Sequence, residues 1–163
     1  MRLAIVSDTH MPRGTRSLPP ACLERLAAAD AILHCGDVAT LGVLADLEAL
    51  GPPVHAVFGN VDDDQLQARL PETLVVDAGG ARIGMVHDPG PRQGRLERLR
   101  ARFPDADAVV FGHTHLPEHA QRGAFQIFNP GSPTERRRAP ARTMGMATVD
   151  GRGTIAFQLV AVG

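Results

Sequence analysis

The stretch Ala108-Val109-Val110-Phe111-Gly112-His113-Thr114-His115 is the starting point from which the rest of the chain can be interpreted. Its four apolar residues predict a short buried strand, and Gly112 begins a tight turn that ends at Leu116-Pro117. Two imidazoles, those of His113 and His115, therefore lie at the carboxyl end of a strand. This spacing on a glycine turn suits two adjacent metal ions better than one ion, provided that other strands deliver ligands to the same edge.

Four further apolar strands end in side chains that could bind a metal ion. Each of these ends is explained by ordinary turn chemistry when it is taken singly, but together they supply only Asp, Asn and His. Functional crevices in open α/β sheets lie beyond the carboxyl ends of the strands, so one edge could collect all of them, and a metal centre is predicted there. The strands and their candidate ligands are Leu3–Val6 with Asp8 and His10, Ala31–Cys35 with Asp37, Val54–Phe58 with Asn60, and Arg82–Val86 with His87.

The donor types indicate the metal and the chemistry. Carboxylate, amide and imidazole groups without a thiolate suit manganese best, with iron, zinc or nickel as alternatives, whereas four imidazoles disfavour magnesium. Seven ligands exceed the need of one ion, but two ions that share a carboxylate would use them all. Two divalent ions at Asp8 and Asp37 would keep a positive charge that attracts phosphate and lowers the pKa of a bridging water. The predicted chemistry is phosphoester hydrolysis by attack of a metal-bridging hydroxide.

Helical patterns alternate with these strands, and glycine turns mark hairpins in the last third of the chain. The pattern predicts an α/β fold in which two packed, mixed β-sheets are flanked by helices, as a single domain over residues 1–163. The predicted helices begin at Pro20 (apolar face Leu23, Leu26 and Ala27), at Thr40, and at Asp62–Asp64, and one covers Gln93–Phe103 with its arginines outward; the hairpins cover 74–86 and 144–162. Residues 133–142 are Arg- and Pro-rich and predict a mobile loop.

Bulk composition excludes several classes of protein. The 163 residues are 44% hydrophobic, yet no apolar run approaches the roughly 18 residues that span a bilayer, and the apolar stretch Leu3–Val6 is too short for a signal peptide. Two cysteines without close spacing are expected to be reduced, so a cytoplasmic protein is predicted. A net charge of -1 gives no reason to expect a nucleic-acid polymer as partner. Residues 1–80 carry -6 and residues 81–163 carry +5, which indicates either solvated surface or an anionic substrate beside an Arg-bearing rim.

Taken together, the motifs resemble those of the calcineurin-like metallophosphoesterases. The matching blocks are Asp8-Thr9-His10, Gly36-Asp37, Gly59-Asn60-Val61-Asp62, His87 and Gly112-His113-Thr114-His115, in the family's order and spacing. Asn129-Pro130-Gly131-Ser132 adds a match to the small YfcE-type phosphodiesterases of bacteria and archaea. The resemblance covers essentially the whole chain and implies a four-layer β-sandwich flanked by helices. It also implies one ion held by Asp8, His10, Asp37 and His115, and a second held by Asp37, Asn60, His87 and His113, so that Asp37 bridges.

Two positions depart from the family pattern. Larger members follow Gly-Asn with a His that assists the leaving group, whereas Val61 here cannot transfer a proton. The block around His87 usually reads His-Gly-His, whereas Asp88 and Pro89 follow here. The predicted catalytic residues are Asp37, Asn60 and Asp62, of which Asp62 either caps the next helix or orients a ligand imidazole.

Other polar residues have less specific roles. His34 is interpreted as a core residue or as a support for the ligands, His55 as structural, and His119 as exposed. The arginines of the 133–142 loop are either solvated or within reach of a phosphate.

The predicted function is a cytoplasmic, dinuclear metal-dependent phosphodiesterase that acts on a small phosphoester, without a membrane partner. A homo-oligomer is compatible with the sequence. Two alternatives stay open. One is a protein-binding scaffold of the same fold, like the retromer subunit of this superfamily. The other is a nucleotide or dinucleotide-polyphosphate hydrolase, which the absence of a histidine at position 61 disfavours.

Overall fold

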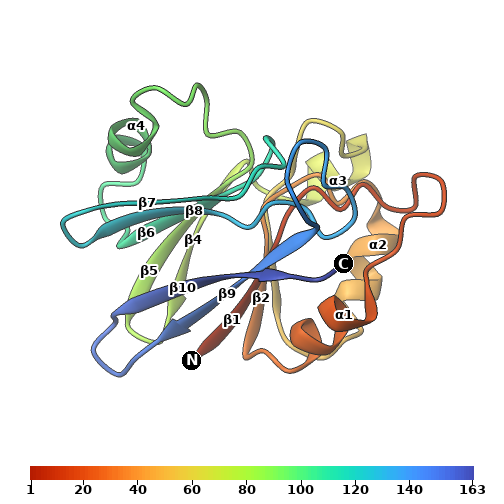
Figure 1. The fold of residues 1–163 in the computed structure, drawn as a ribbon, viewed down its shortest axis with the longest axis horizontal. Coiled ribbons are helices and arrows are strands. Elements are labelled where there is room, and N and C mark those ends of the chain that lie inside the picture. The colour runs from red at the N-terminus through yellow and green to blue at the C-terminus, as the bar shows by residue number, and fades with distance from the viewer.

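Two mixed β-sheets of five strands each pack against one another, and helices cover their outer faces (Figure 1). The computed structural model describes all residues from 1 to 163. The central apolar cluster lies between the sheets, where Leu3, Ile5 and Leu33 of one sheet meet Ile83 and Val110 of the other. The predicted architecture of two packed sheets flanked by helices is confirmed.

The first sheet has the strand order β10-β9-β1-β2-β3. Strands β1, β2 and β3 run parallel, and the C-terminal hairpin β9-β10 joins β1 in the antiparallel direction. The strands are β1 (Arg2–Val6), β2 (Ala31–His34), β3 (Val54–Ala56), β9 (Thr143–Val149) and β10 (Ile155–Ala161). Because β1 to β3 are parallel, the segments that follow them emerge at one edge of the sheet.

The second sheet has the strand order β4-β5-β6-β8-β7. Its inner strands β5, β6 and β8 run parallel, and the edge strands β4 and β7 run antiparallel to their neighbours. The strands are β4 (Thr73–Ala78), β5 (Ala81–Val86), β6 (Ala108–Phe111), β7 (Glu118–Arg122) and β8 (Phe125–Asn129). The sequence does not predict β7, because the segment is almost wholly polar and forms a strand only by pairing along β8.

Helices α1 (Pro20–Ala27) and α2 (Leu41–Glu48) pack on the outer face of the first sheet, and α4 (Arg95–Arg102) packs on the second. The short α3 (Asp64–Arg69) packs beside β3 and α2. Local capping explains where two helices begin. The Thr40 hydroxyl accepts a hydrogen bond from Val43 N at 3.4 Å, and the Asp63 carboxylate accepts one from Leu66 N at 2.8 Å.

Two details of the helix faces differ from the prediction. Leu23 is 38% exposed and Ala27 is also exposed, whereas Cys22 lies with Leu26 on the buried side of α1. Arg95 does not point outward but is 6% exposed. Its guanidinium lies 5.3 Å from the centre of the Phe111 ring and forms an ion pair with Glu118, and these contacts compensate for its burial.

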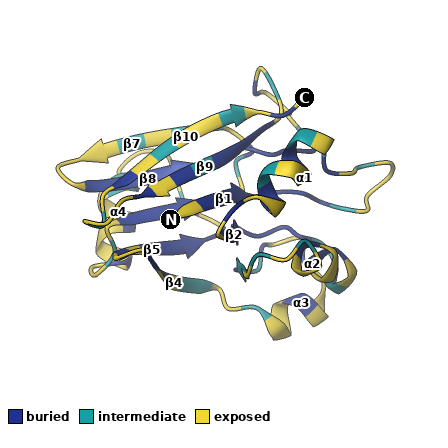
Figure 2. Cartoon of the chain, turned by 90° about the horizontal axis from the view of Figure 1, so that it is seen from below, coloured by how far each residue is buried: buried dark blue, intermediate teal, exposed yellow.

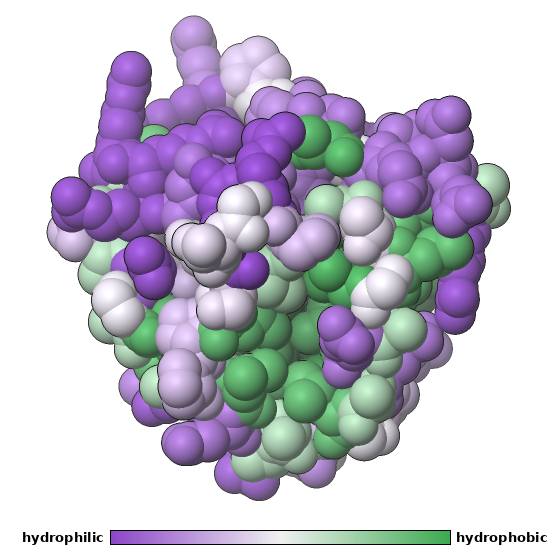
Figure 3. Space-filling model, turned by 90° about the vertical axis from the view of Figure 1, so that its right-hand side faces the viewer, coloured by the Kyte–Doolittle hydropathy of each residue, from purple (hydrophilic) through white to green (hydrophobic).

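The inner strands of the two sheets are the most buried elements (Figure 2), and every residue of β2 and β6 is buried. Seen from the side of α1 and α2, apolar side chains gather over the lower half of the surface and hydrophilic ones over the upper part (Figure 3). The loop 133–142 is irregular, as predicted; it is anchored by buried Thr134 and Ala139 and exposes Arg136 to Arg138. No helix combines the length and the apolar character that crossing a membrane requires.

Candidate metal centre

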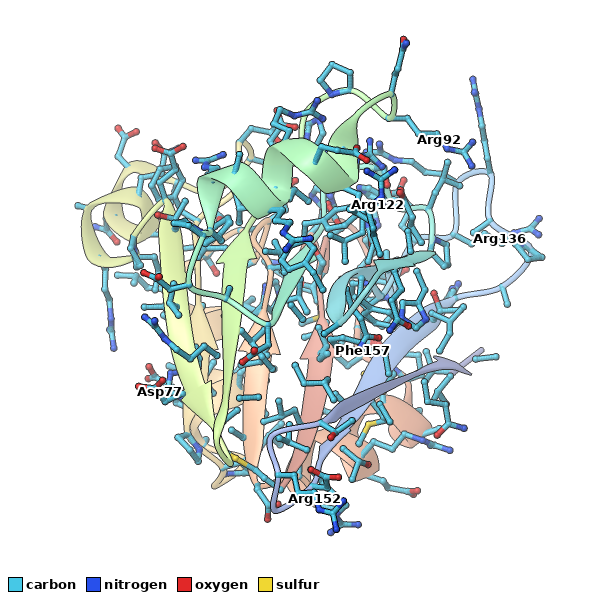
Figure 4. All side chains as sticks on the ribbon, turned by 90° about the vertical axis from the view of Figure 1, so that its left-hand side faces the viewer. Asp77, Arg92, Arg122, Arg136, Arg152 and Phe157 are labelled. Carbon is cyan, nitrogen blue, oxygen red and sulfur yellow. The ribbon has the colours of Figure 1, made fainter.

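All seven predicted ligands come together where the two sheets meet at the carboxyl ends of their strands. The first sheet contributes the residues after β1, β2 and β3, and the second sheet contributes those after β5 and β6. Figure 4 shows β5 with its carboxyl end at the top, and Arg152 near the opposite end of the molecule. The ligands form two adjoining clusters.

The first cluster joins Asp8, His10 and His115, all of which are buried. His10 Nε2 lies 3.1 Å from His115 Nε2, and His115 Nε2 lies 3.3 Å from Asp8 Oδ1. The two imidazole rings are stacked, with centroids 5.0 Å apart. Three donor atoms from two different sheets therefore converge on one point.

The second cluster joins Asn60, His87 and His113, and Asp37 lies beside it. His87 Nε2 lies 3.3 Å from Asp37 Oδ2 and 3.1 Å from Asn60 Oδ1. His113 Nδ1 lies 3.0 Å from the same Asn60 oxygen. Asn60 and His113 are exposed, so this cluster opens to solvent.

Two carboxylates lie between the clusters: Asp8 also comes within 4.8 Å of Asp37 and His87, and Asp37 contacts an imidazole of each cluster through one oxygen. Asp37 Oδ2 lies 3.3 Å from His87 Nε2 and 3.5 Å from His10 Nε2. The other oxygen, Oδ1, accepts a hydrogen bond from Val61 N at 2.9 Å, which fixes the rotation of the carboxylate. Val61 thus contributes its backbone to the site, whereas its side chain is 36% exposed.

Five of the seven candidate ligands have backbone conformations that L-residues rarely adopt. Their φ angles are positive: Asp8 56°, His10 46°, Asp37 57°, His113 69° and His115 57°. Such conformations are costly and persist where surrounding contacts enforce them, which is common at functional sites. None of these residues is glycine, but all five are Asp or His, which adopt positive φ more often than most other side chains.

Surrounding groups fix the orientation of the ligands. The Ser7 hydroxyl donates to Asp8 Oδ2 at 2.7 Å, and His113 N donates to the same oxygen at 3.0 Å. His87 Nδ1 lies 2.8 Å from the carbonyl oxygen of Cys35, so this nitrogen carries a proton. Its other nitrogen, Nε2, faces Asp37 and Asn60 and would offer its lone pair to a bound cation once it has lost its own proton. Cys35 contributes only its carbonyl, and its thiol is not part of the site.

Asp62 supports the loops rather than the imidazoles. Its carboxylate accepts hydrogen bonds from Gly59 N at 2.7 Å, Ala39 N at 2.6 Å and Asp37 N at 3.2 Å. These bonds tie the turn after β3 to the turn after β2 and therefore position Asp37. The two sequence-based interpretations, a helix cap or a partner of an imidazole, do not describe these contacts, and Asp63 is the residue that caps α3.

A segment that the sequence leaves without a role is also tied to the site. The Ser132 hydroxyl donates to Asp8 O at 2.8 Å, and the Thr134 hydroxyl donates to Thr9 O at 2.8 Å. Glu135 follows, and its Oε2 lies 3.6 Å from His115 Nδ1. Only the Asn-Pro-Gly-Ser block gives a signal for this segment, and that signal does not extend to Glu135.

Glycine is required where the strand-end turns come together. A Cβ at Gly112 would overlap the Ser7 hydroxyl and crowd Asp8 Oδ2, and a Cβ at Gly59 would overlap the Asp37 carboxylate. The glycines of these blocks therefore make room for the acidic ligands.

Gly112→Ala is expected to lower the free energy of unfolding by about 1–3 kcal/mol, because the added methyl group overpacks the Ser7–Asp8 contact. Gly151→Ala is the matched control, since a Cβ there meets nothing within 4 Å. Urea denaturation of both variants and of the wild type measures the difference. Equal midpoints for the two variants would contradict the claimed close approach.

Burial dominates the electrostatics of the clusters. Burial raises the pKa of Asp8 to about 7, although His87 and the Ser7 hydroxyl act in the opposite direction. Burial lowers the pKa of His115 to about 4. Burial also lowers the pKa of His87, but the hydrogen bond with Asp37 and the charges of Asp8 and Asp37 outweigh it and raise that pKa to about 9. A cation would stabilise the ionised carboxylates and the neutral imidazoles together.

The donor geometry fits divalent metal ions. Two nitrogens bound to one ion at about 2.0–2.1 Å lie roughly 3.0–3.4 Å apart, and His10 Nε2 and His115 Nε2 are 3.1 Å apart. Only one of these facing nitrogens can hold a proton between them, whereas the lone pairs of both can bind a cation. The oxygen and nitrogen donors of both clusters suit the transition metals that accept carboxylate and imidazole.

The remaining histidines lie outside the clusters. His34 is fully buried, with Nε2 3.1 Å from the Thr9 hydroxyl, so it supports the Asp8–His10 turn. His55 is half-buried in β3. His119 is exposed on β7, as predicted, and its ring packs edge-on against Phe128 and Phe157.

The stacked mixed sheets and the paired Asp/His clusters at their edge define a protein of the metallophosphoesterase type. The sequence profile of the calcineurin-like phosphoesterase superfamily domain matches residues 1–152, and the chain belongs to this superfamily. A probable metallophosphoesterase of Methanothermobacter thermautotrophicus is 32% identical over 84% of this chain and 80% of its own length.

Two further proteins extend the comparison. A phosphodiesterase of Methanocaldococcus jannaschii is 24% identical over 80% of this chain and 83% of its own length. The crystal structure of wild-type Vps29 from Entamoeba histolytica, complexed with zinc, covers 100% of both chains with a TM-score of 0.78 and 24% identity. This structural likeness shows that the two proteins share a fold.

Proposed function

We propose that the protein is a metal-dependent phosphodiesterase that holds two divalent ions and hydrolyses a small phosphoester, with residues 1–163 as one catalytic domain. The observation that carries the proposal is the single oxygen, Asp37 Oδ2, within 3.5 Å of His10 Nε2 and 3.3 Å of His87 Nε2. One carboxylate so placed can serve two ions at once. Membership of a phosphoesterase superfamily and the phosphodiesterase among the relatives support the reaction class.

In this proposal the first cluster (Asp8, His10, His115) and the second cluster (Asn60, His87, His113) each hold one ion, and Asp37 is shared. Manganese is the proposed metal, and the zinc-bound Vps29 structure supports a divalent transition metal at this fold. Such a pair supplies Lewis acidity and a nucleophile drawn from water near neutral pH.

The residues of the chain have distinct roles in this proposal. His87 presents Nε2 because its Nδ1 proton is held by the Cys35 carbonyl. Asn60 contacts both second-cluster imidazoles through one oxygen and is exposed, so its amide is available to a substrate oxygen. Asp62 acts through the backbone of Asp37 and is a positioning residue, since its carboxylate is occupied by three amide donors.

The direct test is to screen the manganese-loaded protein against phosphomonoesters, phosphodiesters and nucleotides. The proposal expects diesters to be hydrolysed fastest and all turnover to stop when a chelator removes the metal. Preferred hydrolysis of dinucleotide polyphosphates would instead favour the nucleotide-hydrolase alternative. A metal-loaded protein that hydrolyses none of the compounds would favour the scaffold alternative, for which the fold shared with Vps29 is the supporting observation.

Val61 leads to a prediction about the leaving group. General-acid assistance is typically worth about 10²–10⁴-fold, and a valine side chain cannot provide it. Diesters with an aryl leaving group, which departs without a proton, are therefore expected to react far faster than alkyl diesters. In Val61→His, kcat/KM is expected to rise more for alkyl diesters than for aryl diesters, because the residue is 36% exposed, follows Asn60 in the chain and is held to Asp37 by its backbone N.

The measurement compares kcat/KM for both ester types in the wild type and in Val61→His at equal metal occupancy. Equal wild-type rates for aryl and alkyl leaving groups would mean that another residue already protonates the leaving oxygen.

A further inference from the structure

A basic hollow lies beside the loop that carries His113 and His115. It has a volume of about 310 Å³ and is lined by Thr114, Leu116, Arg137 and Arg138. Thr114 and Leu116 flank His115 in the sequence, so one wall of the hollow belongs to the loop of the metal centre. The hollow adjoins the candidate site but contains none of its ligands.

The wall formed by the ligand loop is rigidly held. Asn129 is fully buried and donates through Nδ2 to Gly112 O at 3.0 Å and to the Thr114 hydroxyl at 3.1 Å. The Thr114 hydroxyl in turn accepts a hydrogen bond from Leu116 N at 3.2 Å. The Asn-Pro-Gly-Ser block therefore has a structural role, because its asparagine fixes the loop between the metal centre and the hollow.

The opposite wall is anchored where it leaves the site. The hydroxyls of Ser132 and Thr134 donate to the carbonyls of Asp8 and Thr9, both at 2.8 Å. Arg137 then adopts a positive φ of 45°, a turn that brings its side chain and that of Arg138 to the hollow. Arg136, on the same loop, does not line the hollow and points away from the molecule (Figure 4).

The balance of charge around the hollow is positive. Glu135 is the one carboxylate among these side chains, with Oε1 3.0 Å from Arg16 Nη2 and Oε2 3.7 Å from Arg137 Nε. Arg138 has no ion pair and no acidic neighbour in the hollow. The three guanidinium groups of Arg16, Arg137 and Arg138 are thus balanced by one carboxylate, that of Glu135, and two positive charges remain uncompensated.

A second hollow, at the Asn60–His87 end of the metal centre, has the opposite balance. It has a volume of about 420 Å³, and its charged lining consists of Glu72, Asp88 and Arg102. Arg102 Nη2 is already paired with Glu72 Oε1 at 2.7 Å. The two hollows that border the centre thus differ in charge, and an anionic group is stabilised only in the one lined by Arg137 and Arg138.

Building on the proposed function, we propose that the hollow of Thr114, Leu116, Arg137 and Arg138 binds a second anionic group of the substrate. The substrate class is then a phosphodiester in which one esterified alcohol carries its own phosphate or carboxylate. The diester phosphate lies at the Asp/His clusters, and the charged alcohol extends past Thr114 to the two guanidinium groups. Arg137 and Arg138 are specificity residues in this assignment and take no part in bond cleavage.

The test uses 4-nitrophenyl phosphodiesters that share one leaving group and differ in the second alcohol. The alcohols are ethanol (neutral), choline (cationic), 3-hydroxypropanoate (carboxylate) and 2-phosphoethanol (phosphate). The anionic esters are expected to show a kcat/KM about tenfold above the ethyl ester at low ionic strength, with the choline ester below it. This preference is expected to shrink as salt is added, because the guanidinium groups are exposed. The better of the two anionic esters distinguishes a phosphate subsite from a carboxylate subsite.

Single substitutions show which arginines cause the preference for anionic esters. Arg138→Gln and Arg137→Gln are expected to reduce the anionic-to-neutral ratio from about tenfold to about two- or threefold. Arg136→Gln removes the same charge from the same loop outside the hollow and is expected to keep the ratio. Calorimetric binding of propane-1,3-bisphosphonate, compared with ethylphosphonate, gives the same comparison without turnover.

The possible results distinguish a failure of the anionic subsite from a failure of the phosphodiesterase proposal. Turnover of all esters with no preference for the anionic ones, or an equal loss of preference in Arg136→Gln, would overturn the inference and leave the phosphodiesterase proposal standing. No turnover of any ester by the metal-loaded protein would overturn both.

Discussion

Asp37→Ala is expected to lower kcat/KM for an aryl phosphodiester by at least about 10³-fold, the largest loss of any single ligand substitution. The reason is that Asp37 Oδ2 lies within 3.5 Å of His10 Nε2 and 3.3 Å of His87 Nε2, so its removal takes a donor from both clusters. Asp37→Asn keeps the shape of the side chain but removes its charge, and the same direction of effect is expected. His115→Ala removes one donor from one cluster, and a loss of about 10–100-fold is expected.

The comparison is made at saturating manganese. Asp46→Ala is the matched control, because Asp46 is an exposed aspartate on α2, outside the clusters. Thermal unfolding of each variant shows whether the fold is retained. Similar residual rates for Asp37→Ala and His115→Ala would contradict a shared role for Asp37.

The strand exits were predictable from the sequence because an apolar run, such as Ala108–Phe111, indicates a buried strand and an Asp, Asn or His follows each run within two residues of the turn. At Asp37, Asn60 and His113 a preceding Gly also indicates the turn that ends the strand. The parallel pairing of β1 with β2 and of β5 with β6 then brings these ends to one edge. The chemistry of the site therefore follows from residues that are each informative within a few positions.

The contacts that depend on distant parts of the chain were not predictable. Arg95 looks like an outward-facing helix residue until Phe111 and Glu118 are placed beside it. Asp62 looks like a helix cap until Asp37 N, Ala39 N and Gly59 N surround its carboxylate. Such roles arise from partners that the periodicity of a single segment does not reveal.

Glu135 is a further residue whose contacts could not be predicted from the sequence. It lies in an Arg-rich stretch that indicates only a loop, yet its Oε2 lies 3.6 Å from His115 Nδ1 and 3.7 Å from Arg137 Nε. The residues that shape the surroundings of the site therefore come from the irregular segment 132–138, where sequence patterns carry the least information.

Two divalent ions per chain are expected when the protein is loaded with manganese. The first cluster and the second cluster offer six donor residues, and Asp37 lies near an imidazole of each, so that neither ion would lack a carboxylate. Occupancy is also expected to stabilise the fold, by about 2.7 kcal/mol for an ion present at a hundredfold excess over its Kd. Removal of the metal by a chelator is expected to abolish hydrolysis and to lower Tm.

Counting the bound ions by elemental analysis tests the shared Asp37 most directly. The protein is dialysed against manganese and then freed of excess ion, and the analysis is repeated for His113→Ala, which is altered only in the second cluster. The account predicts two ions per chain in the wild type and one tightly held ion in His113→Ala. A single ion per wild-type chain, unchanged in His113→Ala, would contradict it.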